Sequence, residues 1–237
     1  MSENLPKESK FGGSLKGLPD FELEAGNTAF LIIDMQYLDA HREYGIGADA
    51  KRLGADEEYE YYFSRVEDMV IPNIQTLQQV CRRRGIEVMF VRIAALTKDC
   101  RDVSPMHKRL KLLAPKGSKE AEILDEIKPL ENEVLITKGC SGAFNGSNID
   151  QILGNMGIKN LVVSGVVTNY CVETTVRSAG DRDYNVVLID DACAAWTQEA
   201  HDKSLQVLDE GYCKVMTTTA VIDLIESQSQ KPANVHA

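Results

Sequence analysis

The 237-residue chain lacks several motifs that identify common classes of protein. It has no apolar run long enough to cross a bilayer, no G-x-G-x-x-G turn after an apolar strand, and no P-loop. We therefore expect neither a membrane-spanning protein nor one that binds a dinucleotide or a nucleoside triphosphate. The six cysteines form no C-x-x-C pair and have no regular spacing, so we expect most of them to be small core residues.

Positive charge is also scarce. Lysine and arginine number 26 against 36 acidic residues, which gives a net charge of -10. Such a surface repels phosphate backbones and anionic lipids, so we expect no nucleic-acid partner and no membrane partner. The first sixteen residues are polar and lack the apolar core of a signal peptide, which predicts a cytoplasmic protein with reduced thiols.

No linker rich in Gly, Pro or Ser divides the chain. Because 43% of the residues are hydrophobic, the chain can bury one sizeable core. We predict a single domain over residues 21–228, with flexible tails at 1–20 and 229–237.

Six short apolar runs predict strands, at residues 28–34, 86–93, 134–138, 161–166, 186–189 and 214–217. The runs are unbroken rather than alternating, which is typical of parallel strands covered on both faces. Helical patterns lie between them, among them 63–84 and 119–127. Alternating strands and helices predict an α/β, doubly wound sheet with helices on both faces. Ligands bind such sheets beyond the carboxyl ends of the strands.

Two polar segments interrupt this alternation, residues 37–62 after the first strand and 94–118 after the second. Long connections in a compact domain usually serve function, so we interpret both as walls of a pocket. The sequence leaves open whether they act as lids or as subunit contacts.

Three reactive side chains follow strands. Cys171 opens a helix, where the positive end of the helix dipole favours a thiolate and free amides can hold an oxyanion. Asp34 ends a buried strand, which raises a carboxyl pKa and suits a general base. Lys138 can pair with Asp34. Each residue alone has an ordinary structural explanation, but their meeting at one edge of the sheet favours an active site.

No histidine is placed to serve Cys171. His201 falls within a predicted helix and His107 within a loop. The pair Asp39 and His41 forms a lone D-x-H, too few ligands for a metal site.

Residues 28–225 resemble the isochorismatase-like cysteine hydrolase superfamily. The resemblance rests on Leu-Ile-Ile-Asp-Met-Gln at 31–36, Ile-Thr-Lys at 136–138, Ser-Gly-Ala-Phe at 141–144, and the run from Gly165 to Ala179. It implies a Rossmann-like sheet of six parallel strands in the order 3-2-1-4-5-6, and a triad of Asp34, Lys138 and Cys171. It also implies a cis peptide between Val166 and Val167, and an oxyanion hole made by the amides of Val167 and Cys171.

Members of this superfamily that carry the cysteine are mostly amide hydrolases: nicotinamidases, N-carbamoylsarcosine amidohydrolases, and ureidoacrylate and biuret hydrolases. The resemblance therefore implies cleavage of a C–N bond in a small linear amide or ureide through a thioester, with release of ammonia or an amine. Nicotinamidases place a D-x-H after the second strand, and residues 95–101 lack it, so we expect no metal and no cofactor. Two alternatives stay open: a vinyl ether hydrolase with Asp34 as the acid, and a non-catalytic binding partner.

Polar and aromatic residues near the predicted site are candidates for the substrate pocket, namely Gln36, Tyr37, Phe144, Thr168, Asn169 and Trp196. Phe144 and Trp196 fit a core or a subunit contact equally well. Arg42 and Arg92 are candidates to bind a substrate carboxylate. Family members are commonly dimers or tetramers, which implies a homo-oligomer.

Overall fold

The computed structural model describes residues 17–228, and its centre is one sheet of six parallel strands. The order β3-β2-β1-β4-β5-β6 confirms the prediction. The strands are β1 (Thr28–Ile33), β2 (Glu87–Ile93), β3 (Val134–Lys138), β4 (Asn160–Val166), β5 (Asn185–Ala194) and β6 (Lys214–Met216). The order reverses between β1 and β4, the position at which such sheets bind ligands.

The unbroken apolar runs have the predicted explanation, because both faces of the sheet are covered. All six residues of β1 are buried. Phe30 and Ile32 face one hydrophobic core, whereas Leu31 and Ile33 face the other. A strand between two cores needs apolar side chains at every position.

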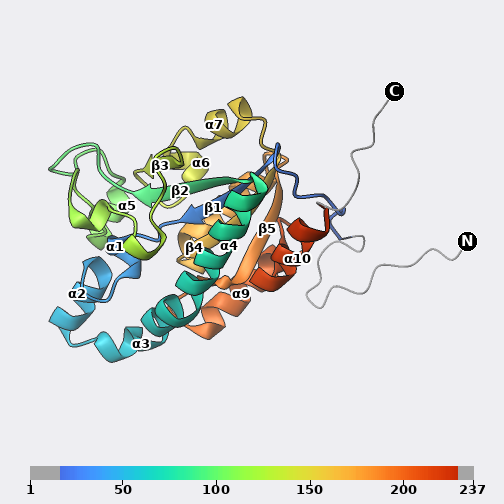
Figure 1. The fold of residues 1–237 in the computed structure, drawn as a ribbon. Coiled ribbons are helices and arrows are strands. Elements are labelled where there is room, and N and C mark those ends of the chain that lie inside the picture. Colours follow the sequence, from blue (N-terminus) through green and yellow to red (C-terminus); the bar gives the residue numbers. More distant parts are fainter. Residues whose placement is uncertain (1–16, 229–237) are drawn as a thin grey trace, which may run out of the picture.

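Two groups of helices cover the sheet (Figure 1). The first face carries α3 (Asp56–Arg65), a π-helical turn η1 (Val66–Val70), α4 (Ile71–Arg84) and α10 (Thr218–Gln228). The second face carries α6 (Ala143–Gly146), α7 (Ile149–Asn155), α8 (Glu173–Gly180) and α9 (Gln198–Leu208).

The segment 37–62 is largely helical, whereas the sequence suggested a long polar connection without regular structure. It contains α1 (Tyr37–Ala40), α2 (Gly45–Leu53) and most of α3. The helix predicted at 63–84 therefore begins at Asp56 and continues through η1 into α4. Its first turns are acidic, and in α3 only Tyr62 and Phe63 are buried, so the apolar periodicity starts late.

The prediction of a helix over residues 119–127 is wrong. The segment forms two 3₁₀ turns, η2 (Lys119–Ala121) and η3 (Asp125–Ile127), and between them Ile123 forms an antiparallel bridge with Gln36. The buried Ala121, Leu124 and Ile127 recur every three residues, which is the period of a 3₁₀ helix. The preceding segment, 94–118, contains the short helix α5 (Pro105–Leu110).

The N-terminal residues that are described lie against the domain. The Leu18 amide donates to the Glu210 carboxylate over 2.7 Å, and Asp20 forms an ion pair with Lys214. The remainder of the predicted tails, 1–16 and 229–237, lies outside the described residues. Within 17–228, no helix is long and apolar enough to span a bilayer.

Candidate active site

A buried ion pair lies at the carboxyl end of the sheet. Asp34 directly follows β1 in a left-handed conformation (φ 52°), and its amide donates to the Val91 carbonyl. Lys138, the last residue of β3, donates from Nζ to Asp34 Oδ2 over 2.8 Å and to the Cys140 carbonyl over 3.1 Å. Neither charged side chain is more than 1% exposed. Asp34 Oδ1 is buried and has no hydrogen-bond partner of good geometry, so this oxygen is free to take a proton.

Cys171 reaches the same pair from β4. The strand ends in a cis peptide between Val166 and Val167, the bond at which the resemblance implied one, and a π-helical turn, η4 (Thr168–Val172), leads into α8. Gly165 has φ 116°, and a Cβ there would lie 2.0 Å from the Ile33 carbonyl oxygen. Only glycine permits this close approach, which places the residues after β4 beside those after β1.

The electrostatics of the thiol differ from the expectation based on the helix dipole. Burial raises the pKa of Cys171 well above its ordinary value, and the nearby carboxylate of Asp34 raises it further, against the opposing effect of Lys138. Burial also raises the pKa of Asp34, while Lys138 and a hydrogen-bonding interaction with the Cys171 thiol act to lower it. The thiol is therefore neutral at rest, beside a carboxylate that can accept its proton.

Burial acts to lower the pKa of Lys138, but Asp34 and the Cys171 side chain outweigh it, so the net pKa is raised and Lys138 stays charged. The structure thus brings together the three predicted reactive residues. The assignment of the Val167 and Cys171 amides as an oxyanion hole stays a prediction. Val167 and Cys171 lie at the two ends of one turn, in which the Val167 carbonyl accepts a hydrogen bond from the Tyr170 amide.

A buried hydrogen-bond network supports this turn. Thr168 Oγ1 lies 2.9 Å from His201 Nδ1, and His201 Nε2 lies 2.8 Å from Asp190 Oδ1. Arg65 Nη2 lies 3.0 Å from the same His201 nitrogen. His201 is fully buried on α9, so the predicted pocket residue Thr168 is anchored to the protein. No local pattern around His201 predicts this role.

Three of the other predicted pocket residues make contacts within the protein. The Gln36 amide nitrogen donates to the carbonyls of Ile93 and Glu120, and its oxygen accepts from the Ile93 amide, so its polar atoms are occupied. The Tyr37 hydroxyl donates to Asp125. Trp196 packs on Tyr62 in the first hydrophobic core, which supports the alternative of a core residue.

The remaining two share a hydrophobic cluster or a turn with Cys171. Phe144 is buried in the same hydrophobic cluster as Cys171 and also contacts Tyr184. Asn169 lies in η4, and its Oδ1 is buried with no partner among the residues described.

Asp39 was not predicted to belong to the site beyond its place in a lone D-x-H. It is 5% exposed, its Oδ2 has no partner in the described chain, and it interacts electrostatically with Asp34, Lys138 and Cys171. The usable signal was the apolar character of its neighbours in α1, all of which are buried. His41 instead stacks on Tyr37. In the described residues, no three His, Cys, Asp or Glu side chains gather as metal ligands.

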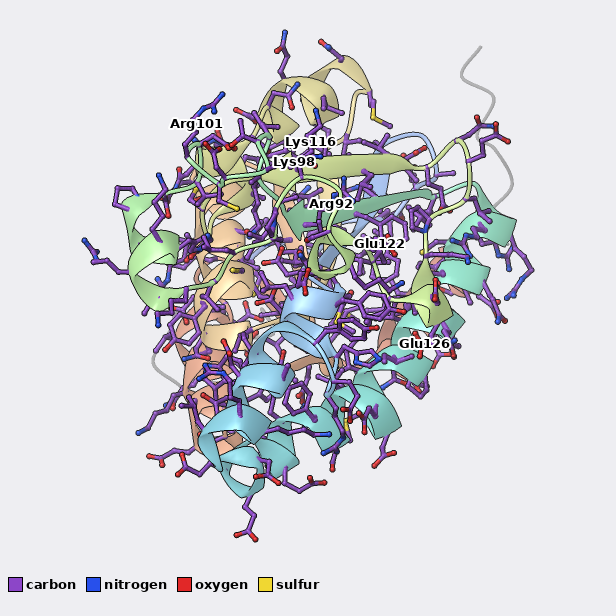
Figure 2. All side chains as sticks on the ribbon, turned by 90° about the vertical axis from the view of Figure 1, so that its left-hand side faces the viewer. Arg92, Lys98, Arg101, Lys116, Glu122 and Glu126 are labelled. Atoms are coloured by element: carbon purple, nitrogen blue, oxygen red, sulfur yellow. The ribbon has the colours of Figure 1, made fainter. Side chains whose placement is uncertain are left out.

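The two candidate arginines differ in availability. Arg42 is bound by Glu60 and Glu67. Arg92 is half-buried and lines a cavity of about 410 Å³ beside β3, together with Lys116, Ser118 and Thr137. Figure 2 views this side of the molecule and places Arg92, Lys98, Arg101 and Lys116 above Glu122 and Glu126. The Arg92 guanidinium also donates to the Ala121 carbonyl over 2.8 Å and shares this cavity with Glu122, and the cavity lining does not include Cys171. Arg92 therefore stays a candidate to bind a substrate carboxylate.

Comparison with known proteins supports this description. Residues 28–220 match the isochorismatase domain model. The ureidoacrylate amidohydrolase RutB of Acinetobacter baylyi is 27% identical, over 92% of each chain. A probable inactive nicotinamidase of Arabidopsis thaliana is 32% identical, over 81% of this chain and 92% of its own.

Among solved structures, a cysteine hydrolase from Pseudomonas syringae pv. phaseolicola superimposes with a TM-score of 0.73 at 24% identity, covering 90% of this chain and 98% of its own. This likeness supports the fold. The match to the domain model covers most of the chain, and the chain therefore belongs to the isochorismatase family of hydrolases.

Proposed function

We propose that this protein is a cysteine-dependent amidohydrolase that cleaves a C–N bond of a small linear amide or ureide through a thioester. The observation that carries the proposal is the buried Asp34–Lys138 pair, with its 2.8 Å contact, beside the Cys171 thiol. The similarity to ureidoacrylate amidohydrolase supports the choice of bond.

The first half-reaction begins from a neutral thiol. Asp34 takes the Cys171 proton as the sulfur attacks the carbonyl carbon, so a C–S bond forms while the carbonyl electron pair moves to oxygen. The amides of Val167 and Cys171 hold that oxyanion. Lys138 remains paired with Asp34 and keeps its carboxylate oriented.

The first half-reaction ends when the oxyanion collapses and the C–N bond breaks. Asp34 gives its proton to the departing nitrogen, which leaves as ammonia or an amine. In the second half-reaction Asp34 takes a proton from water as the water oxygen attacks the thioester carbon. The resulting oxyanion collapses, the C–S bond breaks, the acid product leaves, and the sulfur recovers its proton from Asp34.

The test is ammonia release across a panel of biuret, ureidoacrylate, N-carbamoyl amino acids, nicotinamide and maleamate. We expect turnover of a ureide, and its loss in Cys171→Ala and Cys171→Ser. Cys81→Ala is a matched control, because Cys81 is buried on α4 at the opposite face of the sheet. Near-native turnover by Cys171→Ala would refute the mechanism.

The raised pKa of Asp34 also favours a second candidate, a vinyl ether hydrolase in which Asp34 is the acid. The same variant distinguishes the two, because Cys171→Ala should leave hydrolysis of isochorismate largely intact. A third candidate, a non-catalytic partner protein, draws support from the probable inactive relative. It predicts no turnover of either class of compound by the wild-type protein. The homo-oligomer and the cytoplasmic location stay predictions.

A further inference from the structure

Asp39 is a buried carboxyl group that the proposed mechanism does not use. It lies on α1, five positions after Asp34, and its own backbone is fixed because its carbonyl accepts a hydrogen bond from the Tyr62 hydroxyl over 2.9 Å. The Gln36 side chain holds the start of α1 against β2. Asp39 is buried, with 5% of its surface exposed, and its Oδ2 is inaccessible to solvent.

No lysine, arginine or histidine among the described residues forms an ion pair with Asp39. Lys138, which acts on it electrostatically, already donates to Asp34 and to the Cys140 carbonyl. Burial, and next the Asp34 charge, raise the pKa of Asp39 well above its ordinary value, which favours the protonated carboxylic acid. Its Oδ2 is buried without a partner in the described part of the chain, and an unsatisfied buried polar atom is costly unless a ligand completes it.

A neutral carboxylic acid offers one O–H donor and one carbonyl acceptor side by side. A carbamoyl group, –CO–NH₂, offers the complementary pair, one carbonyl acceptor and one N–H donor. We propose that Asp39 binds the carbamoyl end of the substrate that does not react, and so selects ureides with a carbamoyl group at the far end. This inference rests on the proposed function for the identity of the reaction, but the binding itself needs no turnover.

The first test measures selectivity with two probes. Biuret carries a carbamoyl group at its far end, whereas butyramide carries an alkyl group there. We expect Asp39→Leu to lower kcat/KM for biuret by about 10–100-fold, as for the loss of two buried hydrogen bonds, and to change that for butyramide by less than about threefold. Asp39→Asn keeps a donor and an acceptor, so it should retain most of the preference. Asp49→Asn, on the exposed face of α2, is the matched control.

An equal loss for both probes in Asp39→Leu would overturn the proposal, because a purely structural role affects all substrates alike. The second test uses calorimetry on the Cys171→Ala protein, which needs no reaction. Biuret should bind it at least about tenfold more tightly than it binds the Cys171→Ala, Asp39→Leu double variant. Equal binding to both, or none to either, would overturn the proposal. Asp39-dependent binding without ammonia release by the wild type would instead contradict the proposed function alone.

Discussion

Replacing Lys138 by methionine should test the buried ion pair most directly. The change keeps the length of the side chain but removes the one cation within residues 17–228 that is bonded to Asp34, which is itself fully buried. Removing one partner of a buried pair costs about 3–5 kcal/mol, because the other charge is left uncompensated. For a domain of this size the loss corresponds to a fall in Tm of roughly 6–20 °C.

The penalty should depend on pH, and its sign follows from Asp34. Without Lys138, the pKa of Asp34 in the folded protein rises further above its value in the unfolded chain. The folded state then holds a proton that the unfolded chain has released, so the free energy of unfolding falls by about 1.4 kcal/mol for each pH unit between the two pKa values. The penalty should be small near pH 4 and largest near pH 8.

Urea denaturation followed by far-UV circular dichroism at pH 4, 6 and 8 measures this dependence. The double variant Asp34→Asn, Lys138→Met is the informative control, since it leaves no buried charge and should recover most of the lost stability. If the double variant is as unstable as Lys138→Met at pH 8, the uncompensated charge is not the cause and the reasoning fails.

Two further predictions concern substrate binding and the turn η4 that contains Cys171. Arg92→Met should raise KM for ureidoacrylate by about 10–100-fold, which is the effect of losing a charged hydrogen bond, and should leave KM for biuret unchanged. Equal changes in KM for both substrates would contradict a carboxylate site at Arg92. His201→Phe removes the anchor of Thr168 and should lower kcat for the preferred substrate by about 10–100-fold with little change in KM, because the turn that bears the proposed oxyanion amides loses its position. A kcat within about twofold of wild type would show that the network is structural only.

The strands were predictable because a strand between two cores needs continuous apolar sequence, and β1 meets that requirement at every position. The end of β5 was not predictable. Asp190 and Asp191 suggest a strand end after Ile189, yet β5 continues to Ala194. Their charges find distant partners: Asp190 contacts His201 and Asp191 accepts from the Thr218 amide. Such compensation depends on tertiary contacts that no local pattern encodes.

The site was predictable in its residues but not in its electrostatics. Asp34 and Lys138 lie at strand ends and Cys171 lies in the turn after β4, and parallel strands bring their carboxyl ends to one edge. The helix dipole alone favours a Cys171 thiolate, but burial and the adjacent carboxylate act in the opposite direction and prevail. Asp39 was missed because its burial comes from the packing of α1 against the 3₁₀ segment, which the sequence suggested was an ordinary helix.

The proposed proton-transfer groups all stand at strand ends of the central sheet, whereas Asp39, Lys116 and Ser118 belong to the connections that follow β1 and β2. In the proposed mechanism, and with the proposed role of Asp39, reactivity and selectivity are carried by separable parts of one chain. Mutations accumulating in the two connections can change which molecule is admitted without disturbing the bond-breaking apparatus. Homologous proteins with the same sheet can therefore differ in the nitrogen-containing substrate they bind through changes in these two connections alone.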